Sequence, residues 1–105
     1  MNSKQIVFSF GEHVRSLREE LKLSLREVAA SISVDPSLLG KIERDERQPT
    51  NEQIKLLAIF YKVDEHKLIM ENLSDQIAYK IIDANAETKI FYVAEEKVKY
   101  LKNKK

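Results

Sequence analysis

The segment from Ser24 to Arg44 constrains the fold of this chain most, because it carries the start signals of two closely spaced helices. Ser24 and Glu27 form an S-x-x-E capping box, in which each side chain binds the backbone amide of the other residue. Asp35 caps a second helix, and Pro36 occupies its first position, where the missing amide hydrogen costs nothing. Two helices this short bury little apolar surface alone, so the rest of the chain must supply a scaffold.

The composition favours a helical globular protein. The 105 residues are 43% hydrophobic and 33% charged, and they include only two Gly and two Pro. The absence of cysteine excludes disulfides and thiolate chemistry and fits a reducing cytoplasm. The apolar run at residues 6–10 is too short for a signal peptide or a membrane span. We therefore expect a cytoplasmic protein with no membrane partner.

Two further capping boxes lie on either side of the central segment. Ser9 begins one helix, after a loose arm at residues 1–8, and Thr50 begins another. A fifth short helix is expected to begin near residue 63. The sequence therefore predicts a compact all-α domain of five helices within residues 1–71.

Residues 72–105 form a C-terminal helical extension with two apolar stripes that do not share one register. We favour two helices with a break near Asn85, but no Gly or Pro enforces it, so one long helix stays open. The apolar surface either packs back on the fifth helix or forms a two-fold dimer interface. We favour the dimer interface, formed by Ile77, Ile81, Ile82, Phe91, Val98 and Leu101.

The residues that carry a wider resemblance are FGEHVRSLREELKLSLREVAASISVDPSLLGKIERDERQPT, followed by IKLLAIFYKV. Over residues 10–69 this pattern resembles the lambda-repressor/Cro-type helix-turn-helix family, also called the XRE family. The small size is also similar to that of restriction–modification controller proteins. The resemblance implies a lambda-repressor-like DNA-binding domain over residues 1–71, with a recognition helix at about residues 36–44 that enters the major groove.

The resemblance also implies which residues contact DNA bases. Lys41 can donate to guanine, Ser37 can bond to a base or a phosphate, and Leu38 can touch a thymine methyl group. Gly40 is expected to face outwards and to leave room for close approach. The alternative is an ordinary solvated helix face. The predicted base contacts are Pro36, Ser37, Leu38, Gly40 and Lys41.

Residues that flank the recognition helix are expected to grip the DNA backbone, as they do in the family. The amides that follow Thr50 also present the positive end of a helix dipole. Arg18 and Glu43 match a structural ion pair of the family, which fixes the angle between helices. The predicted phosphate contacts are Ser24, Arg26, Arg44, Arg47, Gln48, Thr50 and Asn51.

Three features depart from the family pattern. Leu25 stands where many members have a Gln that binds phosphate, so one anchor is lost or replaced. Ser33 stands where many have Gly, so Ser33 must adopt a less comfortable conformation or the turn must differ. Asp45 and Glu46 place two acids near the expected DNA, which weakens its attraction.

No motif indicates an enzyme. The two histidines lie on different helices, and the sequence has no Walker loop, dinucleotide-binding motif or nucleophile elbow. We expect no catalytic residue, metal, cofactor or small-molecule ligand. The main hypothesis is a homodimeric transcription regulator that binds a partly palindromic operator in double-stranded DNA. The alternatives are an antitoxin whose tail binds a toxin, and a protein-interaction module that has lost DNA binding.

Overall fold

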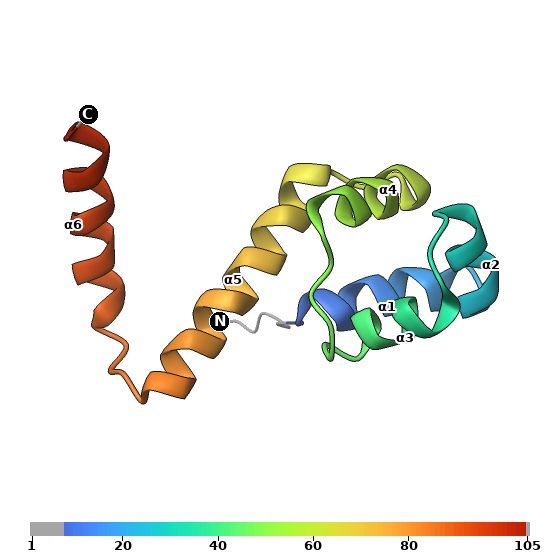
Figure 1. Ribbon diagram of the computed structural model, residues 1–105, viewed down its shortest axis with the longest axis horizontal. Helices are drawn as coiled ribbons and strands as arrows, with labels where there is room; N and C mark the ends of the chain where they lie inside the picture. Colours follow the sequence, from blue (N-terminus) through green and yellow to red (C-terminus); the bar gives the residue numbers. More distant parts are fainter. Residues whose placement is uncertain (1–7, 105) are drawn as a thin grey trace, which may run out of the picture. The chain divides into compact units, whose positions relative to one another are not determined.

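The computed structural model describes residues 8–104, and the regular secondary structure within that range is entirely helical (Figure 1). This confirms the all-α prediction. The arm predicted at residues 1–8 lies outside the described residues, apart from Phe8. The helices are α1 (Phe10–Glu20), α2 (Leu25–Ser31), α3 (Pro36–Glu43), α4 (Asn51–Tyr61), α5 (Glu65–Ala84) and α6 (Ile90–Asn103).

Local side chains determine where the first four helices begin. Ser9, Ser24 and Thr50 each accept a hydrogen bond at 3.1 Å from the backbone amide three residues later. The side chain at that later position accepts from the amide of the cap at 2.7–3.0 Å. Asp35 accepts from the amide of Ser37 at 2.9 Å. All the predicted caps are therefore present.

Several helices end at left-handed residues that are not glycine. Ser33 has φ 60°, so it adopts the less comfortable conformation that the missing glycine implied. Asn85 has φ 53° and separates α5 from α6, which confirms the predicted break. The left-handed residues in the described part of the chain are Lys22, Ser33, Asp45, Lys62 and Asn85.

Replacement of Lys62 by glycine should therefore stabilise the protein. Lys62 is the C-cap of α4 with φ 59°, a conformation that strains an L-residue but not glycine. The free energy of unfolding should rise by up to about 1 kcal/mol, as measured by urea denaturation. Lys55→Gly, in the interior of α4, is the control and should lower it by about 1 kcal/mol. A loss of stability in Lys62→Gly would contradict this expectation.

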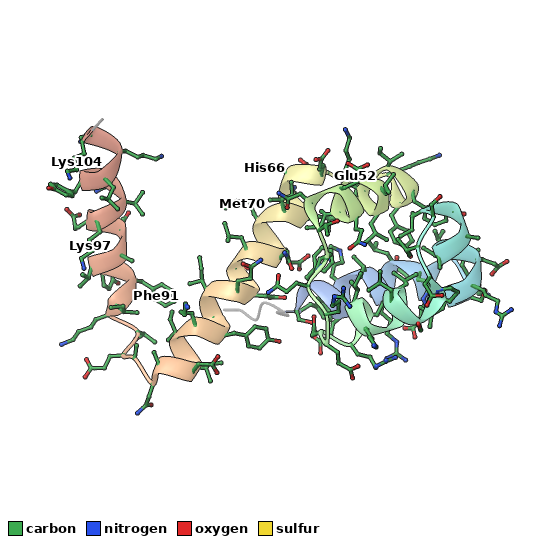
Figure 2. The ribbon with its side chains drawn as sticks, in the orientation of Figure 1. Glu52, His66, Met70, Phe91, Lys97 and Lys104 are labelled. Carbon is green, nitrogen blue, oxygen red and sulfur yellow. The ribbon has the colours of Figure 1, made fainter. Side chains whose placement is uncertain are left out.

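The hydrophobic core lies among α1–α4 and the beginning of α5. Side chains fill the space between these helices (Figure 2), and α3 packs against both α1 and α2. Leu39 of α3 is fully buried within this core. The core residues are Phe10, Val14, Val28, Ala29, Ile32, Leu39, Ile42, Ile54, Leu57, Ala58, Tyr61 and Leu68.

The prediction of a short fifth helix was wrong. α5 continues without interruption from Glu65 to Ala84, because residues 70–74 contain neither a Gly nor a Pro to end it. The chain divides into two compact units between Asp75 and Gln76, inside α5, rather than at the expected residues 71–72. The first unit contains the core, and the second contains the end of α5 and α6. Within residues 8–104 no helix is long and apolar enough to span a membrane.

Candidate nucleic-acid interface

The end of α3 lies directly against the beginning of α1. A Cβ atom at Gly11 would lie 2.5 Å from the carbonyl oxygen of Ile42 and 2.6 Å from that of Glu43. Both are main-chain atoms of α3, so they cannot move aside without moving the helix. Only glycine permits this approach, which fixes the position of α3 relative to α1.

Asp45 secures the same junction. Its carboxylate accepts from the Gly11 amide at 3.0 Å and from the Ser9 hydroxyl at 2.5 Å. The Phe10 amide donates to Asp75 at 2.8 Å, so carboxylates satisfy the first amides of α1. Burial raises the pKa of the Asp75 carboxyl, and the hydrogen bond from Phe10 partly offsets this. Asp45 is therefore a helix cap from a distant part of the chain, a role that we did not predict.

The predicted ion pair between Arg18 and Glu43 is present. Nε and Nη2 of Arg18 donate to the two carboxylate oxygens of Glu43, both at 2.9 Å. The third guanidinium nitrogen donates to the carbonyl oxygen of Leu23, also at 2.9 Å. The side chains are 13% and 3% exposed, and the hydrogen bonds to Glu43 raise the pKa of Arg18. A buried bidentate pair thus joins α1 to the end of α3.

The charges of this ion pair act on the buried side chain of Tyr61. Its hydroxyl is buried and has no hydrogen-bond partner among the described residues. Burial, followed by the negative charge of Glu43, raises the pKa of Tyr61 to about 12. Tyr61 therefore stays neutral at physiological pH and adds no charge beside the ion pair.

The outer face of α3 exposes fewer of the predicted base contacts than expected. Ser37 and Lys41 are exposed, whereas Pro36 and Leu38 are half-buried, and Leu38 packs against the core. The Ser37 hydroxyl donates its hydrogen to the Asp35 carboxylate. The hydrogen bonds from the Ser37 hydroxyl and amide lower the pKa of the Asp35 carboxyl. In this arrangement the Ser37 oxygen is free only to accept a further hydrogen bond.

The prediction that Gly40 faces outwards was wrong, because Gly40 is buried. A Cβ atom there would lie 3.1 Å from a terminal nitrogen of Arg44 and 3.6 Å from Cδ1 of Leu25. Two neighbouring side chains therefore cover this part of the helix. Helical spacing alone does not reveal this, because the covering groups come from α2 and from the residue after α3.

The predicted phosphate contacts lie on exposed positions around α2, α3 and α4. Arg44 pairs with Glu46, with Nε and Nη2 at 3.2 and 3.3 Å from its carboxylate oxygens. The hydroxyl oxygens of Ser24 and Thr50 accept hydrogen bonds from the backbone amides that they cap, so each hydroxyl can still donate its own hydrogen to a phosphate. The remaining members of this group are exposed and are Arg26, Arg47, Gln48 and Asn51.

Comparison with known protein families shows to which family these helices belong. Residues 14–68, just over half of the chain, match the helix-turn-helix family. The chain belongs to the helix-turn-helix family, of the XRE type. The match includes α2 and α3, the two helices predicted to form the helix-turn-helix motif. The family comprises DNA-binding regulators rather than enzymes.

Two solved structures are similar to this helix-turn-helix protein. The restriction-modification controller protein C.AhdI from Aeromonas hydrophila has a TM-score of 0.53 and 30% identity, over 56% of this chain and 89% of that chain. A chain of the SinR protein/SinI protein complex has a TM-score of 0.54 and 22% identity, over 90% of this chain and 98% of that chain. The second likeness shows the fold alone. No curated protein matches this chain.

Proposed function

We propose that the protein binds double-stranded DNA sequence-specifically as a homodimer and thereby regulates transcription from a partly palindromic operator. The observation that carries this proposal is the exposed face of α3, where Lys41 has no carboxylate partner among residues 8–104. Gly11 and the Arg18–Glu43 pair hold that helix from behind. A helix held in this way is suited to the major groove, where base pairs present distinct donors and acceptors.

The contacts follow from the chemistry of each side chain. Lys41 donates to O6 or N7 of guanine, whereas Ser37 accepts from the amino group of adenine or cytosine. Leu38 and Pro36 touch thymine methyl groups with the part of each side chain that is exposed. Gly40 is covered in the free protein and is left out of this set. The phosphate grip is assigned to Ser24, Arg26, Arg44, Arg47, Gln48, Thr50 and Asn51.

Two substitutions should separate base reading from phosphate binding. Lys41→Ala should remove about 1–3 kcal/mol of discrimination at one or two base positions. Arg47→Ala should weaken all duplexes alike and lower the salt slope of log K by about 1, because one fewer phosphate is neutralised. Fluorescence anisotropy, on duplexes selected from a random pool and at several salt concentrations, measures both effects.

Lys55→Ala is the matched control, because it removes the same charge from an exposed position in the middle of α4. It should change neither discrimination nor the salt slope. If no duplex binds the wild-type protein at low salt, DNA binding is refuted and the protein-interaction module is the better description.

The argument for a dimer comes from α6. All of its 14 residues are exposed, although Phe91, Val98 and Leu101 form an apolar stripe along it. The side chains project from the helix, with Phe91 in its first turn and Lys97 further along (Figure 2). An isolated helix of this length is marginally stable in water, so another surface must cover the stripe. A second copy supplies a self-complementary surface and a second recognition helix for a half-site about 34 Å away.

The end of α5 adds to the proposed interface. Ile77 and Ile82 are 46% and 69% exposed, whereas Ile81 is half-buried. Any truncation that tests the interface must leave the first unit intact. Asn72 is buried and Asp75 caps α1, so the chain should be cut after Asn85 and not after Glu71.

Val98→Glu should dissociate the dimer. It places a carboxylate in the middle of the stripe, at a cost of at least about 2 kcal/mol, which raises the dimer dissociation constant about 30-fold or more. Tyr92→Glu is the control, because Tyr92 is 74% exposed and lies away from the stripe. Sedimentation equilibrium measures both variants and the chain cut after Asn85. A monomeric wild-type protein would contradict the homodimer, and unchanged self-association of the shortened chain would exclude α6 from the interface.

The antitoxin alternative predicts a different outcome for the same tail. One of the similar folds was solved in a complex of two differently named proteins, SinR and SinI. A monomeric wild-type protein that forms a stable one-to-one complex with the product of a neighbouring gene would replace the homodimer by that alternative.

A further inference from the structure

Leu25 lies beside the outer face of the recognition helix. It is the first residue of α2, and its Cδ1 lies 3.6 Å from the position that a Cβ atom of Gly40 would take. This is an ordinary van der Waals distance. The side chain packs against the core but is only half-buried, so part of it stays exposed. A leucine methyl group therefore lies beside the place where a side chain at position 40 would begin.

Gly40 shares one face of α3 with the residues proposed to contact DNA. Ser37, Lys41 and Arg44 stand three positions before, one after and four after Gly40, which places all four on one side of the helix. The guanidinium of Arg44 also lies beside Gly40, with its nearest nitrogen 3.1 Å from the position of a Cβ atom there. This nitrogen is the end of a flexible side chain, so it can move. Leu25 therefore adds an apolar group from α2 next to the polar and charged side chains of Ser37, Lys41 and Arg44.

The chemistry of leucine limits what this surface can recognise. A leucine side chain cannot hydrogen-bond to a phosphate, so it does not anchor the DNA backbone. In the major groove, the apolar group that a base pair presents is the 5-methyl group of thymine. A methylated cytosine carries the same group at the same ring position. Contact between two methyl groups removes apolar surface from water and is therefore favourable.

The geometry points to Leu25 as a specificity-determining residue that reads the 5-methyl group of a pyrimidine in the major groove. This inference rests on the proposed DNA binding. It differs from the base contacts assigned to α3, because the reading side chain comes from α2 and passes over Gly40. It also gives a function to the absence of a side chain at position 40.

The test uses the full chain and a duplex selected from a random pool, whose affinity for the wild-type protein is measured first. The thymines are then replaced by deoxyuridine one position at a time, which removes the methyl group and keeps the base-pairing pattern. At one or two positions per half-site the wild-type affinity should fall about fourfold, which corresponds to the burial of one methyl group. In a second arm each cytosine is replaced by 5-methylcytosine, and a fourfold gain there would identify methylated cytosine as the source of the methyl group.

Three variants show whether Leu25 is responsible. At the position that Leu25 reads, Leu25→Ala should bind the thymine and deoxyuridine duplexes with about equal affinity, whereas a methyl preference that Leu38 or Pro36 supplies should persist in this variant. Leu25→Met keeps an apolar contact and should keep the penalty, and it guards against loss of folding in the alanine variant. Lys41→Ala should also keep the penalty, because it removes a different contact.

The outcomes separate this inference from the proposed function. If the wild-type protein binds the selected duplex but no methyl group in either arm alters its affinity, the role of Leu25 is refuted and DNA binding stands. A methyl preference that persists unchanged in Leu25→Ala at every position also refutes it. If the wild-type protein binds no duplex, the proposed function fails and this inference fails with it.

Discussion

Replacement of Gly11 by alanine should lower the free energy of unfolding by about 3 kcal/mol or more. The added methyl group would lie 2.5 Å from the carbonyl oxygen of Ile42 and 2.6 Å from that of Glu43. Relief of this overlap requires α3 to move away from α1, which also breaks the hydrogen bond from the Gly11 amide to Asp45. Urea denaturation followed by far-UV circular dichroism measures the loss.

The other glycine of the chain provides a matched control. A Cβ atom at Gly40 meets the end of the flexible Arg44 side chain at 3.1 Å and Leu25 at 3.6 Å, with no main-chain atom among its nearest neighbours. Gly40 also lies in the interior of α3, where alanine is favoured by up to about 1 kcal/mol. Gly40→Ala should therefore keep or raise the stability. If Gly11→Ala were as stable as Gly40→Ala, the close approach of α1 and α3 would not determine the fold.

The contrast between the two glycines shows what the sequence could predict. Helix starts were predictable because Ser9, Ser24 and Thr50 bind groups only three residues away. The roles of Gly11 and Asp45 were not, because their partners lie more than thirty residues distant in the chain. The helical pattern predicted that Gly40 faces outwards, because such a pattern does not show which side chains of neighbouring elements cover a position.

The end of α5 and the ion pair illustrate two further limits. No Gly or Pro near position 71 ends α5, and the hydrogen bond from the Phe10 amide to Asp75 joins the helix to α1 beyond that point, a contact that the local sequence does not show. Arg18 and Glu43 are 25 residues apart, and their pairing followed from the family resemblance rather than from spacing. The contacts with DNA remain predictions. Of the five predicted base contacts, Ser37 and Lys41 are exposed and Gly40 is buried.

Removal of one partner of the Arg18–Glu43 pair should lower the free energy of unfolding by about 3–5 kcal/mol, because it leaves the other charge buried without a counter-ion. The Glu43 side chain is 3% exposed, whereas that of Arg18 is 13% exposed and also donates to the carbonyl oxygen of Leu23. Arg18→Ala, which leaves the more buried charge without a partner, should therefore be the more damaging change. Tyr61→Phe is the control at the same place. Its hydroxyl is buried without a partner among the described residues, so its removal should leave the stability unchanged or slightly raised.

The double variant Arg18→Met/Glu43→Leu separates stability from positioning. Two apolar side chains of similar size leave no buried charge, so its loss of stability should be far smaller than the sum of the two single losses. If the pair also fixes the angle of α3, this folded variant should lose discrimination among DNA sequences while it retains the salt-dependent binding to phosphates. Near-additive losses of stability would show instead that the pair contributes no coupling, and α3 would then be held mainly by the contact at Gly11.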